Sequence, residues 1–455
     1  MRKDPGLPPA LQPPDGSAQT ALTRRYELIT PLFGGGVRPG RHDLITPVRG
    51  TAVRGQLRFW WRATRGRFYK DIDALRTAEG LLWGAASSNA EARPSQVQIV
   101  VSEVSAGHDF VVTDNQGRKA TDSRGDPISV GHFRSPYSYV AFPLQQSRGV
   151  VRDDISFTLT VTMPATWRKD KDRNDAAHFF GSPADEIAAA IWAWETFGGI
   201  GARTRRGFGA LRCREAQGGG PDLPDADVLS WLAKQLARHV VSGGNRPEGV
   251  PLLSPDLRWY RAQPAQRTPL RFWNDPLEAW KQLFGRLKEF RQPRPPGTVD
   301  PRRPGRSRWP EPEAIRGLTR RRLPRHQLLP GSGKFPRAVF GLPLIFQFKD
   351  AGDPEQTSLQ GVDKIDRLAS PLILRPLALA KGSWVGLAAV LDAPPTPPGG
   401  LTLRQGKTQV APSATAAAPD YILTPAEAAR IKDQTGRHQL LGSSTDLLEA
   451  FLNFL

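Results

Sequence analysis

The residues best suited to chemistry lie in a glycine-rich segment, Gly199-Ile-Gly-Ala-Arg-Thr-Arg-Arg-Gly-Phe-Gly209. Glycine lets a backbone approach a ligand closely, and guanidinium groups pair with phosphate oxygens in a forked geometry. The segment therefore predicts contacts to a phosphodiester backbone from Gly199, Gly201, Arg203, Arg205 and Arg206. An ordinary flexible turn with solvated arginines is the alternative. A dinucleotide site is excluded, because the segment follows a helix and enters a strand, the reverse of the Rossmann order.

A second basic segment, Arg49-Gly-Thr-Ala-Val-Arg-Gly-Gln-Leu-Arg-Phe-Trp-Trp-Arg62, follows a glycine run at residues 34–36 and interleaves arginine with aromatic residues. This mixture is typical of grooves for single-stranded nucleic acid, where bases stack and phosphates pair with cations. Its apolar residues recur at helical spacing, so the tryptophans are expected in the core. Arg54, Arg58, Arg62 and Arg65 form a separate stripe. It predicts RNA contacts from Arg54, Arg58 and Arg62, although a merely solvated face is the alternative.

A third basic segment, Pro304-Gly-Arg-Ser-Arg-Trp-Pro-Glu-Pro-Glu-Ala-Ile-Arg316, contains prolines that oppose regular structure. It is expected to be an extended loop in which Arg306 and Arg308 contact RNA.

The composition favours a polyanionic partner. The chain has 63 Lys and Arg against 44 Asp and Glu, a net charge of +19, and arginine far outnumbers lysine. Arginine forks onto phosphate and stacks on bases, which favours RNA; an arginine-biased, GC-rich genome would give the same composition. Cys213 is the only cysteine, so an intrachain disulfide is excluded and a reducing, cytoplasmic location is expected. No stretch has the length of a membrane span, so no membrane partner is predicted.

Catalytic and metal motifs are weak. His42 beside Asp43, and His326 in an arginine-rich loop, are the candidates for an acid–base ribonuclease site, but a lone His-Asp pair is usually a loop feature. We find no HExxH, paired-cysteine or EF-hand motif, and a P-loop-like stretch has Leu401 where the first glycine is required. We therefore predict no metal, no cofactor and no enzymatic activity.

The expected elements suggest an α+β protein with two domains. Strands are predicted at 24–30, 97–104, 155–162 and 211–213, with helices at 51–67 and from a capping signature at Ser182 to Gly198. The order βαββαβ is the ferredoxin-like, RRM-like plan, here with long loop insertions. We predict a disordered tail over 1–22, a first ferredoxin-like domain over 23–216, and a second over 217–455 with an insertion at 393–419 and C-terminal helices.

Six ordered segments between residues 26 and about 380 resemble the two-domain RAMP subunit of the type III-B CRISPR effector complex. They begin at Ile29 (ITPLFGGG), Val48 (VRGTAVRGQLRFWWR), Phe197 (FGGIGARTRRGFG), Gly305 (GRSRWPE), Phe340 (FGLPLIF) and Arg367 (RLASPLILRP). The proline-rich tail and the 393–419 insertion depart from this pattern and receive no family role.

The resemblance implies two ferredoxin-like domains and a place in an antiviral ribonucleoprotein near the 3′ portion of its guide. The expected partners are guide RNA (crRNA), complementary target RNA and other RAMP subunits, and cleavage of the target belongs to a different subunit in that family. We therefore expect a noncatalytic RNA-binding subunit. A metal-independent endoribonuclease that processes guide RNA is the alternative, and a purely structural subunit with a solvated basic face is a third interpretation.

Overall fold

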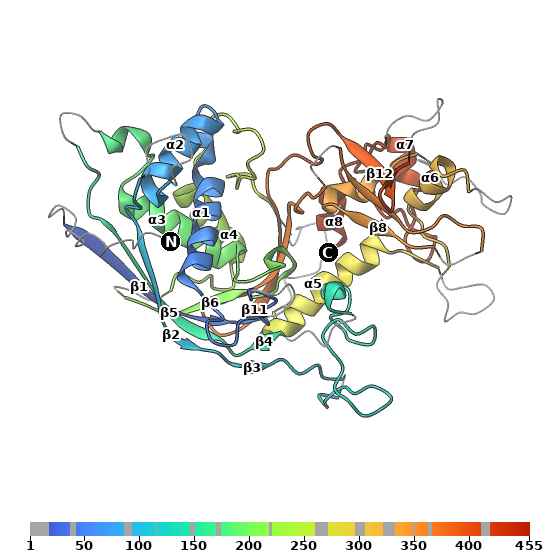
Figure 1. The fold of residues 1–455 in the computed structure, drawn as a ribbon, viewed down its shortest axis with the longest axis horizontal. Coiled ribbons are helices and arrows are strands. Elements are labelled where there is room, and N and C mark those ends of the chain that lie inside the picture. Colours follow the sequence, from blue (N-terminus) through green and yellow to red (C-terminus); the bar gives the residue numbers. More distant parts are fainter. Residues whose placement is uncertain are drawn as a thin grey trace, which may run out of the picture.

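The computed structural model describes residues 18–36, 42–85, 93–114, 116–145, 151–169, 174–217, 221–259, 272–295, 305–321, 333–348, 351–362, 366–410 and 419–455. They form two lobes, with the helix α5 (Pro276–Arg291) running between them (Figure 1). No helix in these ranges is long and apolar enough to cross a bilayer.

The first lobe is built on a four-stranded antiparallel sheet. Its strands lie in the order β2 (Gln98–Ser105), β5 (Ser156–Pro164), β1 (Gln19–Leu28) and β6 (Leu211–Ala216). Helices gather on one side of this sheet (Figure 1): α1 (Gly50–Arg65), α2 (Ile72–Trp83), α3 (Pro183–Phe197) and α4 (Val228–His239). The element order and the strand order are those expected of a βαββαβ unit.

Local signals explain these elements. Alternate residues of β5 are buried, which is the period expected of a strand with one covered face. The predicted capping box at α3 is present, since Ser182 Oγ accepts from Asp185 N and the Asp185 carboxylate accepts from Ser182 N. One boundary was wrong: the predicted tail of residues 1–22 ends earlier, because β1 already begins at Gln19. Residues 1–17 lie outside the described residues.

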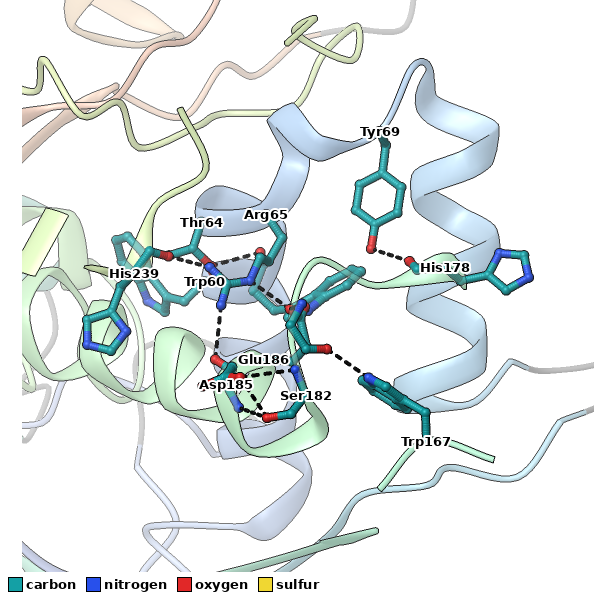
Figure 2. Close-up of polar contacts among 12 residues, drawn as sticks. Trp60, Thr64, Arg65, Tyr69, Trp167, His178, Ser182, Asp185, Glu186 and His239 are labelled. Carbon is teal, nitrogen blue, oxygen red and sulfur yellow. Dashed lines mark hydrogen bonds and ion pairs between the residues drawn. The ribbon is translucent and has the colours of Figure 1, made fainter. Parts of the chain in front are cut away.

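A buried ion pair joins the two main helices of this lobe (Figure 2). Arg65 Nε, at the end of α1, donates to Glu186 Oε1 at 2.9 Å, and Trp61 Nε1 donates to Glu186 Oε2 at 2.7 Å. The Arg65 and Glu186 side chains are 3% and 0% exposed. Arg65 also donates to the Asp185 carbonyl at 3.0 Å. Burial raises the pKa of Glu186, while the charge of Arg65 and the hydrogen bonds act in the opposite direction.

A long insertion between β2 and β5 reaches the second lobe. It contains the short strands β3 (His108–Asp109) and β4 (Arg152–Asp153) and a 3₁₀ turn at Phe142–Leu144. Tyr137 of this insertion packs against Trp280 of α5, with ring centroids 5.4 Å apart. The insertion therefore belongs to the contact between the lobes.

The second half contains two further antiparallel sheets. One has the order β10 (Leu372–Ala378), β11 (Trp384–Val390), β7 (Arg258–Trp259), with α5 packed on β10 and β11. The other has the order β13 (Thr408–Gln409), β12 (Leu401–Gln405), β9 (Thr357–Gly361), β8 (Leu344–Phe346). The remaining helices are α6 (Glu311–Leu318), α7 (Pro425–Arg430) and α8 (Leu447–Phe454).

Two expectations for this half need correction. A second complete ferredoxin-like domain is not confirmed: β7, α5, β10 and β11 follow its first four elements, but no fourth strand joins their sheet in the described ranges. The stretch at 393–419 is not only an insertion, because β12 pairs with β9 inside a sheet. Its residues 411–418 lie outside the described residues.

The two halves share apolar packing. The largest buried cluster combines residues of the first lobe, Leu232 and Leu236 of α4 among them, with Leu377 of β10 and Leu387 of β11. The predicted boundary after residue 216 therefore does not mark a break in packing.

Candidate nucleic-acid interface

The glycine-rich loop, residues 199–209, lies between α3 and β6 and folds against the loop that follows β1. Ala202 N donates to the Phe33 carbonyl at 2.7 Å, and Gly209 N donates to the Pro31 carbonyl at 2.9 Å. Gly201 has φ +84°, and a Cβ there would lie 2.7 Å from the Phe33 carbonyl oxygen. A Cβ on Gly199 would lie 2.6 Å from the Gly209 carbonyl oxygen. Gly199 and Gly201 were predicted to contact RNA. In the structure, their lack of a side chain lets the protein's own backbone approach closely.

Arg205 and Arg206 extend from this loop to the second half, and we call this contact the seam. Arg205 Nη1 donates to the Ser370 carbonyl, and Arg206 donates to the carbonyls of Leu372 and Phe340, both at 3.1 Å. Burial lowers the pKa of Arg205 to about 10 and of Arg206 to about 9, so both stay charged at neutral pH. The two predicted phosphate contacts therefore have carbonyl partners within the protein.

Arg203 lies in the same loop but has a different environment. Its backbone is left-handed, with φ +59°, a conformation that costs a non-glycine residue about 1–2 kcal/mol. No hydrogen bond or ion pair of its side chain is found among the described residues, and its Nε is buried without a partner. Its guanidinium carbon lies 5.1 Å from the ring centroid of Phe142. Burial and the nearby charge of Arg291 lower the pKa of Arg203 to about 10.

Arg291, in the last turn of α5, completes a group that we call the seam cluster: Arg203, Arg205, Arg206 and Arg291. Arg291 Nη1 donates to the Tyr139 hydroxyl at 3.1 Å, and its guanidinium carbon lies 5.4 Å from the Phe340 ring centroid. The charges of Arg291, Arg203 and Arg205 each act to lower the pKa of Arg206. In the described part of the chain, no carboxylate pairs with any of the four. Four neighbouring cations without a counter-charge form an anion-binding arrangement.

A buried arginine of the second half fixes both ends of the glycine-rich loop. Arg375 on β10 donates to the Gly198 carbonyl at 2.8 Å and to the Leu211 carbonyl at 2.7 Å. It also donates to the Pro376 carbonyl at 3.1 Å. The geometry of the loop therefore depends on the second half of the chain.

The predicted α1 stripe is engaged within the first lobe. Arg58 Nε lies 2.8 Å from Glu79 Oε1 on α2, and Arg62 pairs with the same oxygen. Arg54 donates to the Trp83 carbonyl. The expected placement of the tryptophans is confirmed, since Trp60 and Trp61 are buried in the core. RNA contact by Arg54, Arg58 and Arg62 stays a prediction, but these groups already have partners that compete with phosphate.

The third basic segment is not an extended loop throughout, because its residues from Glu311 onward are helical in α6. Its first part lies against the end of α5. Gly305 N donates to the Pro295 carbonyl at 2.7 Å, and Arg308 N donates to the Pro293 carbonyl at 3.0 Å. Trp309 anchors the segment, because its buried indole donates to the Phe290 carbonyl at 3.1 Å. The backbone of Arg306 and Arg308 therefore lies beside the residues that follow Arg291 at the end of α5, and no sequence pattern predicted this contact.

The weak catalytic candidates gain no geometric support. Asp43, next to His42, accepts hydrogen bonds from Ile45 N and Thr46 N at 2.9 and 3.0 Å, and these bonds lower its pKa. It therefore organises its own turn. His326 lies outside the described residues. Among the residues that the structure covers, no group of three His, Cys, Asp or Glu could hold a metal ion.

Sequence reasoning missed Arg291, Arg375 and Phe142. Arg291 reads as an ordinary cation at the end of an amphipathic helix, and Arg375 as a single charge in an apolar strand. Phe142 lies in a segment with no periodic pattern. Only Arg375 could have been found from the sequence. It is the single charge in an apolar strand, and a buried cation requires partners.

Comparisons with known proteins give the following. Residues 25–212 match the model of the RAMP superfamily. Among solved structures, the chain is similar to the crystal structure of Cmr1 from Pyrococcus furiosus in its apo form, with 16% identity over 86% of this chain and 92% of that one, and a TM-score of 0.43. It is also similar to a chain in the cryo-EM structure of the type III-B Cmr-beta bound to cognate target RNA, with 12% identity over 82% of this chain and 94% of that one, and a TM-score of 0.46. No curated protein matches the chain.

Proposed function

Because residues 25–212 match the model of the RAMP superfamily, we propose that the chain is a noncatalytic RNA-binding subunit of a type III-B CRISPR ribonucleoprotein. Its partners in this proposal are guide RNA, complementary target RNA and other RAMP subunits, and it holds RNA near the 3′ end of the guide. The assignment to the type III-B complex rests on the six ordered sequence segments. RNA binding rests on the seam cluster.

The observation that carries RNA binding is the uncompensated charge at the seam. Arg203 has no hydrogen-bonded partner among the described residues, and Arg291 leaves its Nε without one. A phosphate bound by the terminal guanidinium nitrogens of both residues would reduce the repulsion between the cations. The net charge of +19 would attract the polyanion to this face over a longer range.

The proposed mechanism is neutralisation of the RNA backbone with release of counterions. Contacts to phosphate carry no sequence information, which suits a guide whose sequence must vary. Binding should therefore weaken linearly with the logarithm of salt concentration, with a slope near 0.7 for each phosphate neutralised on a single strand.

We expect unrelated single-stranded RNAs of equal length to bind the full chain with affinities that agree within about threefold, and with the same salt slope. Fluorescence anisotropy across a salt series measures both quantities. Gel analysis of the same RNAs after incubation, with and without EDTA, should recover them intact. Affinity that is absent at low salt or insensitive to salt would contradict RNA binding. Cleaved RNA would instead support the guide-processing alternative.

A further inference from the structure

An exposed aromatic ring lies beside the unpartnered arginine of the seam cluster. Phe142 is 53% exposed, although large apolar side chains are normally covered. Its neighbours hold it firmly in place: Ala141 is fully buried, Leu144 is almost so, and the 3₁₀ turn Phe142–Leu144 includes Pro143. The ring is therefore displayed at a fixed position rather than on a loose loop.

The groups around this ring match the parts of a nucleotide. The Arg203 guanidinium lies 5.1 Å from the Phe142 ring centroid, and Arg291 is tied to Tyr139, three residues before Phe142, by a 3.1 Å hydrogen bond. Arg203 and Arg291 both have a buried Nε without a partner. A base can stack on an aromatic ring while an adjacent cation holds its phosphate, which is how single strands are bound without sequence preference.

Resting on the proposed function, we propose that Phe142 is a stacking platform for one RNA base, and that Arg203 and Arg291 hold the phosphate next to it. The site is assembled from three separate parts of the chain: the insertion between β2 and β5, the glycine-rich loop and the end of α5. A nucleotide bound there would contact both lobes at once.

A second exposed phenylalanine provides a matched control. Phe133 is 71% exposed in the same insertion, and the guanidinium carbon of Arg134 lies 5.9 Å from its ring centroid. Arg134, however, already donates to the Thr121 carbonyl at 3.0 Å. Phe133, like Phe142, is therefore exposed and lies near an arginine, but its arginine already has a hydrogen-bond partner.

We expect Phe142→Leu to weaken binding of an unstructured 20-nucleotide RNA to the full chain by about 5- to 100-fold, as loss of one stacked base does. The salt slope should stay unchanged, because no phosphate contact is lost. Phe133→Leu should bind as the wild type does. Arg203→Gln should lower the slope by about 0.7. Circular dichroism checks that each variant is folded.

An RNA of equal length carrying stable abasic spacers separates stacking from other effects. Wild type and Phe142→Leu should bind it with equal affinity, because it offers no base to stack. If Phe142→Leu binds ordinary RNA as tightly as the wild type does, or loses equal affinity for both RNAs, the platform is wrong while RNA binding by the chain stands. If Phe142→Leu leaves RNA binding unchanged, the exposed ring would instead contact a neighbouring subunit. If the wild type binds no RNA, the proposed function itself fails.

Discussion

Replacing Glu186 with alanine is expected to lower the free energy of unfolding by about 3–5 kcal/mol, the usual cost of breaking a buried ion pair from one side. Glu186 is fully buried and pairs with Arg65 (Figure 2). It also accepts a hydrogen bond from Trp61 Nε1. Its loss would leave the Arg65 cation in the core, with carbonyl oxygens as its only hydrogen-bond acceptors among the described residues. It would also remove the polar contact between α1 and α3, the two main helices of the first lobe.

Glu79→Ala is the matched control, because Glu79 is also a single carboxylate that pairs with arginine, here Arg58 and Arg62. Those side chains are 37% and 30% exposed, so they can turn to water when the carboxylate is removed. We expect its cost to be about 1 kcal/mol or less. Urea denaturation followed by tryptophan fluorescence compares the two variants. A loss from Glu186→Ala no larger than that from Glu79→Ala would show that the buried pair does not stabilise the lobe.

Gly207→Ala is expected to lower the free energy of unfolding by about 2–5 kcal/mol through overpacking and backbone strain at the seam. Gly207 has φ +88°, and a Cβ there would lie 2.3 Å from Trp280 Nε1 and 2.8 Å from the Leu374 carbonyl oxygen. Trp280 cannot easily move aside, because it is fully buried and donates to the Arg206 carbonyl at 2.7 Å. The variant should therefore displace the glycine-rich loop from α5 and weaken RNA binding as well.

Gly243→Ala is a control that separates the backbone strain at Gly207 from the steric clash with Trp280. Gly243 has φ +73°, but a Cβ there would meet no atom within 4 Å. This control should therefore cost only the left-handed conformation, about 1 kcal/mol. Equal urea midpoints for the two alanine variants would mean that the contact between Gly207 and Trp280 is loose, and that the second half does not fix the loop.

The first lobe could be predicted well because its signals are local. The capping box at Ser182 and Asp185 places the start of α3, and alternation places β5. The second half could not be predicted as well, because some of its strands are very short and pair across long distances in sequence. Trp259, for example, pairs with Ala389, and β7 is only two residues long. Periodicity cannot identify a two-residue strand.

The candidate site was predicted only in part, for a physical reason. A guanidinium group can donate to a backbone carbonyl as well as to a phosphate, so residue type alone cannot distinguish the two. Arg205 and Arg206 bind carbonyls across the seam, whereas Arg203 has no such partner among the described residues. Arg291 joins them through tertiary contact, although it is 85 residues or more away along the chain.

The central claim is that RNA is held at the seam, and two double variants test it most directly. Each double variant removes the same charge from the full chain. The seam variant is Arg203→Gln/Arg291→Gln, and the α1 variant is Arg58→Gln/Arg62→Gln, which removes the pairs with Glu79. Anisotropy with single-stranded RNA across a salt series should show at least about tenfold weaker binding for the seam variant, and a slope lower by about 0.7, because the two groups hold one phosphate. The α1 variant should lose less affinity, because Arg58 and Arg62 pair with Glu79, which competes with phosphate for them. Wild-type affinity in the seam variant, or a larger loss in the α1 variant, would contradict the account.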